Sequence, residues 1–393
     1  MSFWQQYWHV IAFYAFIGLL IYFYRSKFEF EAKFIGLLRT DTGVKWMNTH
    51  GKRWARFYRP ISEIGVWVGF AGMALIMGYL FYGLYQLLAV PNAPPVVSPV
   101  LPGITIPGTG ITIPLIAGLL ALFIVVAVHE AAHGIVSAAH NIKVKHSGVG
   151  FFGPIPVAFV EPNEEKIDKA SAKTQLRIFA AGPWSNILQA VVALALMLLI
   201  GAALSPLVHT QGIQFENVQE GSPAELAGIQ AQTAYTSING EEITNIQGFL
   251  SHIQNVSAGE TIILNEQAII LGQNQEENAC IGVTGITNAY ADEDFRIQYP
   301  FFSSSILYIQ EIIYWVFVLA LGLGLANLLP LGPVDGGRMI LHPLKAVFSE
   351  ETATMIWSNL AKGLLVILLI LLVVPIIQVF TASTPAAATC LPL

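Results

Sequence analysis

Apolar residues are concentrated in six long runs along the chain, and polar residues collect in the segments between them. The runs cover Tyr7–Tyr24, Ile61–Val90, Leu115–His140, Ile178–Leu204, Ile306–Leu328 and Met355–Phe380. An apolar helix of about 20 residues is long enough to cross the roughly 30 Å of hydrocarbon in a bilayer. The pattern therefore predicts a polytopic α-helical membrane protein with about six transmembrane helices.

The composition agrees with a membrane protein. Of the 393 residues, 54% are hydrophobic and 11% are charged, whereas globular proteins carry about 25% charged residues. A net charge of −6 argues against a nucleic-acid partner, which would require a basic face. The first run is rich in aromatic residues and leads into Arg25 and Lys27 rather than into a small-residue cleavage site. We therefore expect a retained anchor there and not a signal peptide.

The Lys and Arg residues alternate between the segments that connect the runs. Residues 25–59 contain nine of them and residues 141–177 contain six, whereas residues 91–114 contain none and residues 205–305 contain only Arg296. Cytoplasmic loops of membrane proteins hold the excess of Lys and Arg. We therefore expect a multi-pass protein of the cell membrane with a basic cytoplasmic loop at 25–59. The N terminus, the 205–305 segment and the C terminus are expected to be extracytoplasmic.

Three ionisable side chains lie close together inside the third apolar run, which reads LFIVVAVHEAAHGIVSAAH. His129 and His133 share one face of a helix, where their imidazoles can bind one zinc ion while Glu130 acts as general base. A charge at the middle of a bilayer costs about 2.5–3.5 kcal/mol, and a bound cation would offset this cost. The alternative is a pair of buried histidines that hydrogen-bond to neighbouring helices.

A third metal ligand is needed, because catalytic zinc takes three protein ligands and keeps one position for water. Asp335 is the candidate, since it follows the fifth run in NLLPLGPVDGGRM, where Pro330 and Pro333 interrupt the helix and two glycines allow a sharp turn. The third and fifth runs both end on the predicted cytoplasmic side, so the site is expected in the membrane towards that side. Asp335 could instead be a solvated loop charge or a helix N-cap.

Two segments between the runs have the composition of folded polar structure. Residues 141–162 alternate β-forming residues with Gly and Pro, which predicts a membrane-associated β-hairpin. Residues 206–290 contain VQEGSPAELAGIQ and YTSINGEEI, with a short helix expected from Ala224 and a turn at Asn239–Gly240. This inserted segment resembles a PDZ domain, an α+β fold that binds peptides by strand addition. The tripeptide QTA at 232–234 replaces the usual Gly-Asp, which weakens the prediction of peptide-carboxylate binding.

The motifs HEAAH, AAGPWSN at Ala180–Asn186 and NLLPLGPVDGG, with the inserted segment, resemble the site-2 protease family of intramembrane zinc metalloproteases, in particular its prokaryotic members. The resemblance covers roughly residues 113–340, and Val334 replaces a leucine of the family pattern. It implies one zinc ion per chain, bound by His129, His133 and Asp335, with Glu130 as catalytic base.

The resemblance also assigns a supporting role to three further residues of these motifs. It implies that the substrate or the transition state is supported by Asn186, Asn327 and Pro330. A helix-packing amide is the alternative for Asn186, which could otherwise bond Glu130 or the substrate carbonyl. Helix termination is the alternative for Asn327 and Pro330.

The expected function is hydrolysis of a peptide bond within or near the transmembrane helix of a single-span membrane protein that another protease has already trimmed. Accordingly, we expect an N-terminal two-span region at 1–112, a catalytic core at 113–205 and 291–345, a PDZ-like extracytoplasmic domain at 206–290, and a C-terminal span and tail at 346–393.

A di-iron enzyme would need further histidine boxes. A non-proteolytic transporter or a PDZ-bearing scaffold, which needs no metal, is the remaining alternative.

Overall fold

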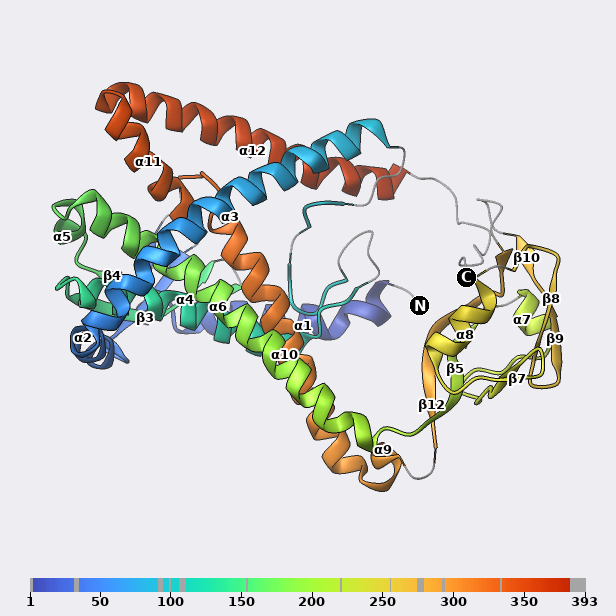
Figure 1. Ribbon diagram of the computed structural model, residues 1–393. Helices are drawn as coiled ribbons and strands as arrows, with labels where there is room; N and C mark the ends of the chain where they lie inside the picture. The colour runs from blue at the N-terminus through green and yellow to red at the C-terminus, as the bar shows by residue number, and fades with distance from the viewer. Residues whose placement is uncertain are drawn as a thin grey trace. The chain divides into compact units, whose positions relative to one another are not determined.

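The computed structural model describes most of the chain (Figure 1). The described residues are 3–31, 35–90, 95–98, 100–105, 111–152, 155–219, 221–254, 256–273, 279–291, 294–332 and 334–381. Pro333 and the predicted tail after residue 381 therefore lie outside the described residues. The chain divides into two compact units, one formed by residues 1–197 with 310–381 and the other built mainly from residues 198–309.

Five helices of the described chain are long and apolar enough to cross a membrane. They are α3 (Ala55–Ala89), α4 (Leu115–Ala139), α6 (Ala172–Leu204), α10 (Pro300–Ala326) and α12 (Glu350–Thr381). These helices confirm the prediction of a multi-pass helical membrane protein. The first apolar run forms α1 (Phe3–Phe23), whose apolar part Tyr7–Phe23 is shorter. A sixth transmembrane helix therefore stays a prediction.

The predicted hairpin is present and belongs to a larger sheet. Its strands β3 (Val144–Phe152) and β4 (Ile155–Pro162) are antiparallel. Two strands from the N-terminal segment, β1 (Glu29–Glu31) and β2 (Ile35–Thr40), extend the sheet in the order β1-β2-β3-β4. The short helices of this unit are η1 (Arg25–Lys27), α2 (Val44–Arg53), α5 (Glu164–Asp168) and α11 (Asp335–Val347). The basic segment that we expected as a loop thus contains η1, β1, β2, α2 and the first residues of α3.

Glycines of α3 bring this helix into close contact with the elements that carry the candidate site. A Cβ added at Gly65 would lie 2.9 Å from the Trp184 ring of α6, and one at Gly69 would lie 2.7 Å from Met339 of α11. Small residues allow transmembrane helices to approach each other in this way. Helix α3 therefore packs directly against both α6 and α11.

The second unit is an α+β structure with its own apolar core. Strands β5 (Thr210–Val218) and β12 (Val283–Tyr290) pair with each other, and a four-stranded sheet has the order β7-β6-β8-β9. Its remaining elements are η2 (Ser205–Leu207), α7 (Pro223–Leu226), β6 (Ser237–Ile238), β7 (Glu241–Glu242), α8 (Ile246–Ile253), β8 (Thr261–Leu264), β9 (Gln267–Ile270), β10 (Gly272–Gln273), β11 (Ala279–Cys280) and α9 (Phe295–Gln298).

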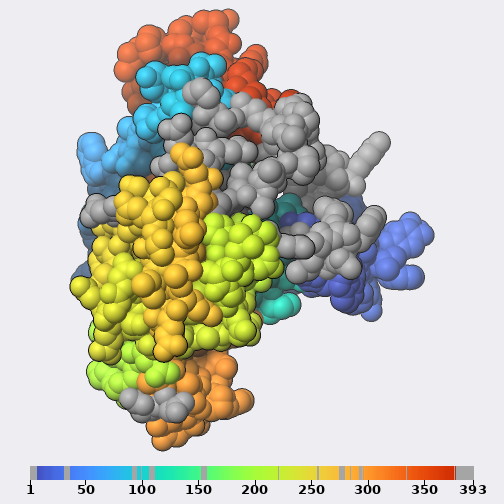
Figure 2. Space-filling model, turned by 90° about the vertical axis from the view of Figure 1, so that its right-hand side faces the viewer, coloured from blue at the N-terminus to red at the C-terminus, as the bar shows by residue number. Residues whose placement is uncertain are grey.

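The core of this unit is formed by side chains from the β5–β12 pair, the four-stranded sheet and α8, with Phe215 and Phe249 among its fully buried members. The predicted turn at Asn239–Gly240 joins β6 to β7, and both residues have positive φ, as a tight hairpin turn requires. The residues of the unit, coloured lime to orange in Figure 2, form one contiguous body. The prediction that it is a PDZ-like domain stays a prediction.

Candidate metal centre

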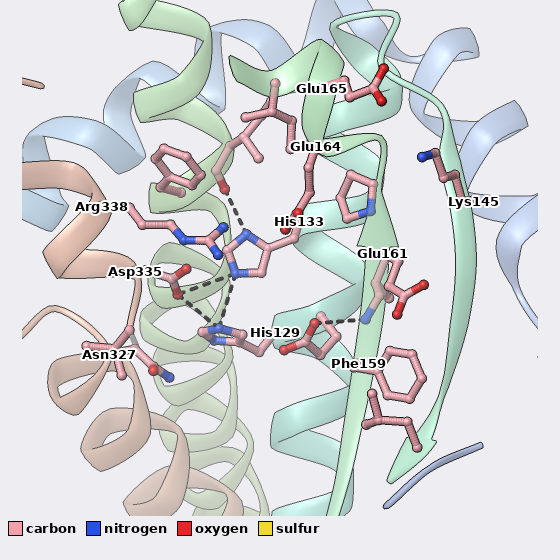
Figure 3. A pocket seen from close by; sticks show the side chains of 18 of the residues that line it. His129, His133, Lys145, Phe159, Glu161, Glu164, Glu165, Asn327, Asp335 and Arg338 are labelled. Atoms are coloured by element: carbon pink, nitrogen blue, oxygen red, sulfur yellow. Dashed lines mark hydrogen bonds and ion pairs between the residues drawn. The ribbon is translucent and has the colours of Figure 1, made fainter. Parts of the chain in front are cut away.

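Two segments that are far apart in the sequence bring three potential metal ligands together. His129 and His133 lie one turn apart on α4, with their Nε2 atoms 3.2 Å from each other. Asp335 is the first residue of α11, and its Oδ2 lies 3.2 Å from His129 Nε2 and 3.4 Å from His133 Nε2 (Figure 3). Among the described residues, this is the group of His, Cys, Asp and Glu side chains that could share a metal ion.

The three donor atoms fit a tetrahedral metal site. Zinc binds imidazole nitrogen at about 2.0–2.1 Å, so two ligands of a tetrahedral zinc ion are about 3.3 Å apart. The separations of 3.2, 3.2 and 3.4 Å agree with this value. A carboxylate oxygen is a common zinc ligand beside imidazole nitrogens.

Gly182 of α6 provides the space in which the two imidazoles meet. A Cβ added at this position would lie 2.3 Å from His133 Nε2 and 2.4 Å from His129 Nε2. Real Cβ atoms essentially never approach other atoms this closely, so any side chain here would occupy the place of the ligand atoms. This contact explains the glycine in the AAGPWSN motif, which lies on the buried face of α6.

The turn between α10 and α11 places Asp335 beside the histidines. The Gly336 N–H donates to Asn327 O at 2.7 Å, which closes the turn. A Cβ at Gly336 would lie 2.2 Å from Leu328 O, and one at Gly337 would lie 1.8 Å from Leu331 O. The two glycines expected to allow a sharp turn are thus required by close backbone contacts. The N-cap of α11 is Val334, and the Asp335 side chain contacts the histidines instead of capping the helix.

Glu130 lies beside the three ligand candidates and faces the same cavity. Its Oε2 accepts a hydrogen bond from the Val160 N–H of β4 at 3.1 Å. The cavity has a volume of about 810 Å³, and its lining includes His129, Glu130, His133, Phe159, Val160, Asn327, Asp335 and Arg338. In Figure 3, β4 lies between the histidines and the strand that carries Lys145. A carboxylate and a strand edge therefore lie side by side at the candidate metal site.

The three residues expected to support the substrate lie in different surroundings. Asn327 lines the cavity and is drawn near His129 in Figure 3. Pro330 is buried in the turn before α11. Asn186 is fully buried, and its Nδ2 lies 3.1 Å from His129 Nδ1. Its contact is therefore with a ligand candidate and not with Glu130.

Some features of the site have no signal in the sequence. The partner of Glu130 is a backbone N–H, which every residue except proline offers, so no residue type could indicate Val160. Arg39 of β2 pairs with Glu161 at 2.8 Å and so ties the N-terminal strand to the end of β4. Arg338 lies over the Phe179 ring at 5.5 Å at the cavity wall. The sequence reasoning missed both arginines.

Comparison with known proteins identifies relatives over most of the chain. The sequence profile of peptidase family M50 matches residues 117–371. An uncharacterized protein of Methanocaldococcus jannaschii is 27% identical over 328 residues, which cover 81% of this chain and 81% of that protein. Zinc metalloprotease RasP of Shouchella clausii is 26% identical over 219 residues, which cover 44% of this chain and 50% of that protein.

Proposed function

We propose that this chain, which belongs to peptidase family M50, the site-2 protease family, hydrolyses a peptide bond in a membrane-embedded substrate with one bound zinc ion. The observation that carries the proposal is the approach of His129, His133 and Asp335 to within 3.4 Å of one another beside Glu130, in a multi-pass membrane protein. Three ligands that leave a fourth position for water are typical of catalytic zinc.

The residues of the site have separate tasks in this reaction. A zinc ion bound here supplies a Lewis acid that lowers the pKa of water and polarises the scissile carbonyl. Glu130 takes the proton from the attacking water and passes it to the nitrogen of the leaving amine. The Val160 N–H binds Oε2 of Glu130, which leaves Oε1 as the atom that receives the proton. Asn327, which lines the cavity, hydrogen-bonds the backbone of the substrate in this proposal.

Strand β4 provides an edge on which an unwound substrate segment can be held. Within the described part of the chain, no strand pairs with the outer edge of β4. The N–H of Val160 points away from β3 to Glu130, and N–H groups alternate in direction along a strand, so that of Ala158 also points outward. Pro156 and Pro162 share this direction and have no N–H. Because the Val160 N–H is already bound to Glu130, an added strand would find its donor at Ala158.

Replacing Ala158 with proline tests this role of the edge. The exchange removes an outward N–H without removing a hydrogen bond to β3, so we expect cleavage of a reconstituted single-span substrate to fall by about tenfold or more. Zinc content and the unfolding temperature should stay close to those of the wild type. Ala158→Gly, which keeps the N–H, should retain most of the activity. Equal cleavage by the proline and glycine variants would argue against strand addition at β4.

The substrate class is part of the same proposal. We expect a single-span membrane protein whose extracytoplasmic part has been trimmed by another protease, with residues 206–290 acting as a size filter. In this arrangement the N terminus, the 206–290 segment and the C terminus are extracytoplasmic, and the site lies towards the cytoplasmic side. Cleavage of a substrate with a short ectodomain should exceed that of the same substrate with a folded ectodomain. Deletion of 206–290 should remove the difference, and a difference that persists would refute the filter.

Metal analysis of the purified protein tests the proposed function most directly. We expect about one zinc ion per chain in the wild type and a loss of it in His129→Ala, because one of three ligands is removed. His146→Ala is the matched control, since His146 pairs with Asp41 at 3.6 Å and lies outside the cluster. A His129→Ala protein that keeps stoichiometric zinc would rule out this metal site, as would a wild type that binds none.

A further inference from the structure

The imidazole nitrogens that face away from the cluster both contact helix α6. His133 Nδ1 lies 2.7 Å from Ile178 O, and His129 Nδ1 lies 3.1 Å from Asn186 Nδ2. A backbone carbonyl oxygen can only accept a hydrogen bond, so His133 donates with Nδ1–H, and in the neutral ring this leaves Nε2 without a proton. Helix α6 therefore selects the tautomer of His133 that can bind a metal through Nε2.

The same tautomer is required of His129, but its outer partner is a side-chain amide. His129 Nε2 is the atom that faces Asp335, at 3.2 Å. A neutral imidazole that binds a metal through Nε2 carries its proton on Nδ1. With Nδ2 of Asn186 opposite, two N–H donors would face each other. The oxygen and nitrogen of an amide exchange places when the amide is rotated by 180°, and their assignment follows from the hydrogen bonds that they make.

The surroundings of Asn186 are consistent with the rotated amide. Its side chain has an exposed fraction of 0%, and no hydrogen-bond partner within the described residues holds its Oδ1 in the present position. A Cβ added at Gly324 of α10 would lie 3.1 Å from Asn186 Cβ, so α10 packs closely over this side chain. Asn186 also does not line the cavity. A buried amide in this position can act on His129 but has no access to the substrate.

We propose that Asn186 is a positioning residue whose Oδ1 accepts a hydrogen bond from His129 Nδ1–H and so keeps Nε2 directed at the metal. The inference rests on the proposed function, because it requires a metal ion bound by His129. It replaces the expected role of Asn186 in supporting the substrate. Partners of the outer nitrogen of a metal-binding histidine typically contribute 10–100-fold to metal affinity.

Zinc affinity, measured by competition with a chromophoric chelator, tests the inference without any assay of cleavage. Asn186→Leu removes the acceptor at similar volume, so we expect zinc binding to weaken by about 10–100-fold. Asn186→Asp keeps an acceptor and should stay within about threefold of the wild type. Gln189→Leu is the matched control, because Gln189 lies one turn further along α6 and its Oε1 has no hydrogen-bond partner among the described residues. Its zinc affinity should equal that of the wild type.

The outcomes separate this inference from the proposed function. If Asn186→Leu binds zinc as tightly as the wild type while His129→Ala loses it, the metal site stands and the role of Asn186 is refuted. If Asn186→Asp binds as weakly as Asn186→Leu, acceptance by Oδ1 is refuted. If His129→Ala also keeps its zinc, the proposed function itself fails. The unfolding temperature of each metal-free variant shows whether a loss of affinity comes from misfolding.

Discussion

Glu130→Gln should abolish measurable cleavage of a reconstituted single-span substrate, while the protein keeps about one zinc ion per chain. The amide retains the shape of the side chain but cannot take a proton from water. General acid–base catalysis typically contributes 10²–10⁴-fold, so we expect a decrease of at least this size. Zinc should stay because the group that could hold the metal consists of His129, His133 and Asp335 and does not include Glu130.

The control for this prediction is the same exchange at an exposed position. Glu351 lies in the first turn of α12 and is exposed, so Glu351→Gln should cleave like the wild type. Zinc content and cleavage are measured on the same preparations. Undiminished cleavage by Glu130→Gln would exclude Glu130 as the base. A loss of zinc in this variant would instead show that the carboxylate helps to hold the metal.

Gly182→Ala should lose both zinc and cleavage, although the exchange adds a single methyl group. The new Cβ would lie 2.3 Å from His133 Nε2 and 2.4 Å from His129 Nε2, so one or both imidazoles must move away from Asp335. Changes in the partners that orient metal ligands already cost 10–100-fold in affinity. Displacement of the ligand atoms themselves should weaken zinc binding by about 100-fold or more.

Helix α6 offers a matched control for this exchange. A Cβ at Gly201 would have no atom within 4 Å, so Gly201→Ala should bind zinc and cleave substrate like the wild type. Chelator competition and cleavage of the reconstituted substrate are measured for both variants. If Gly182→Ala keeps wild-type zinc affinity, the close approach of α6 to the histidines does not exist in the active protein.

Local sequence patterns were sufficient to predict several parts of this protein. The long apolar runs predicted the five long helices, because an apolar length of about 20 residues is itself the requirement for crossing a bilayer. The HEAAH spacing placed His129 and His133 on one face, because the helical repeat is known in advance. Alternating β-forming residues predicted the hairpin of β3 and β4. The prolines and glycines around Asp335 predicted the turn that α11 follows.

Other parts of the site depend on segments that no local pattern connects. The pairing of β2 with β3 joins the N-terminal segment to the hairpin, and nothing in residues 25–59 indicates where their backbone hydrogen bonds go. Asn186 could be recognised as a polar residue in an apolar run, but its partner was not predictable. The same holds for Glu130, whose oxygen binds the backbone N–H of Val160.

The sequence by itself determined the class of protein, the spacing of the two histidines and the candidates for the third ligand and the base. These features follow from composition and from the periodicity of a single helix. Only the tertiary structure decided that Asp335 reaches both histidines, that Gly182 provides their space and that α6 faces their outer nitrogens. The physical reason is that these distances depend on how α4, α6 and α11 pack, which is a property of all three helices together.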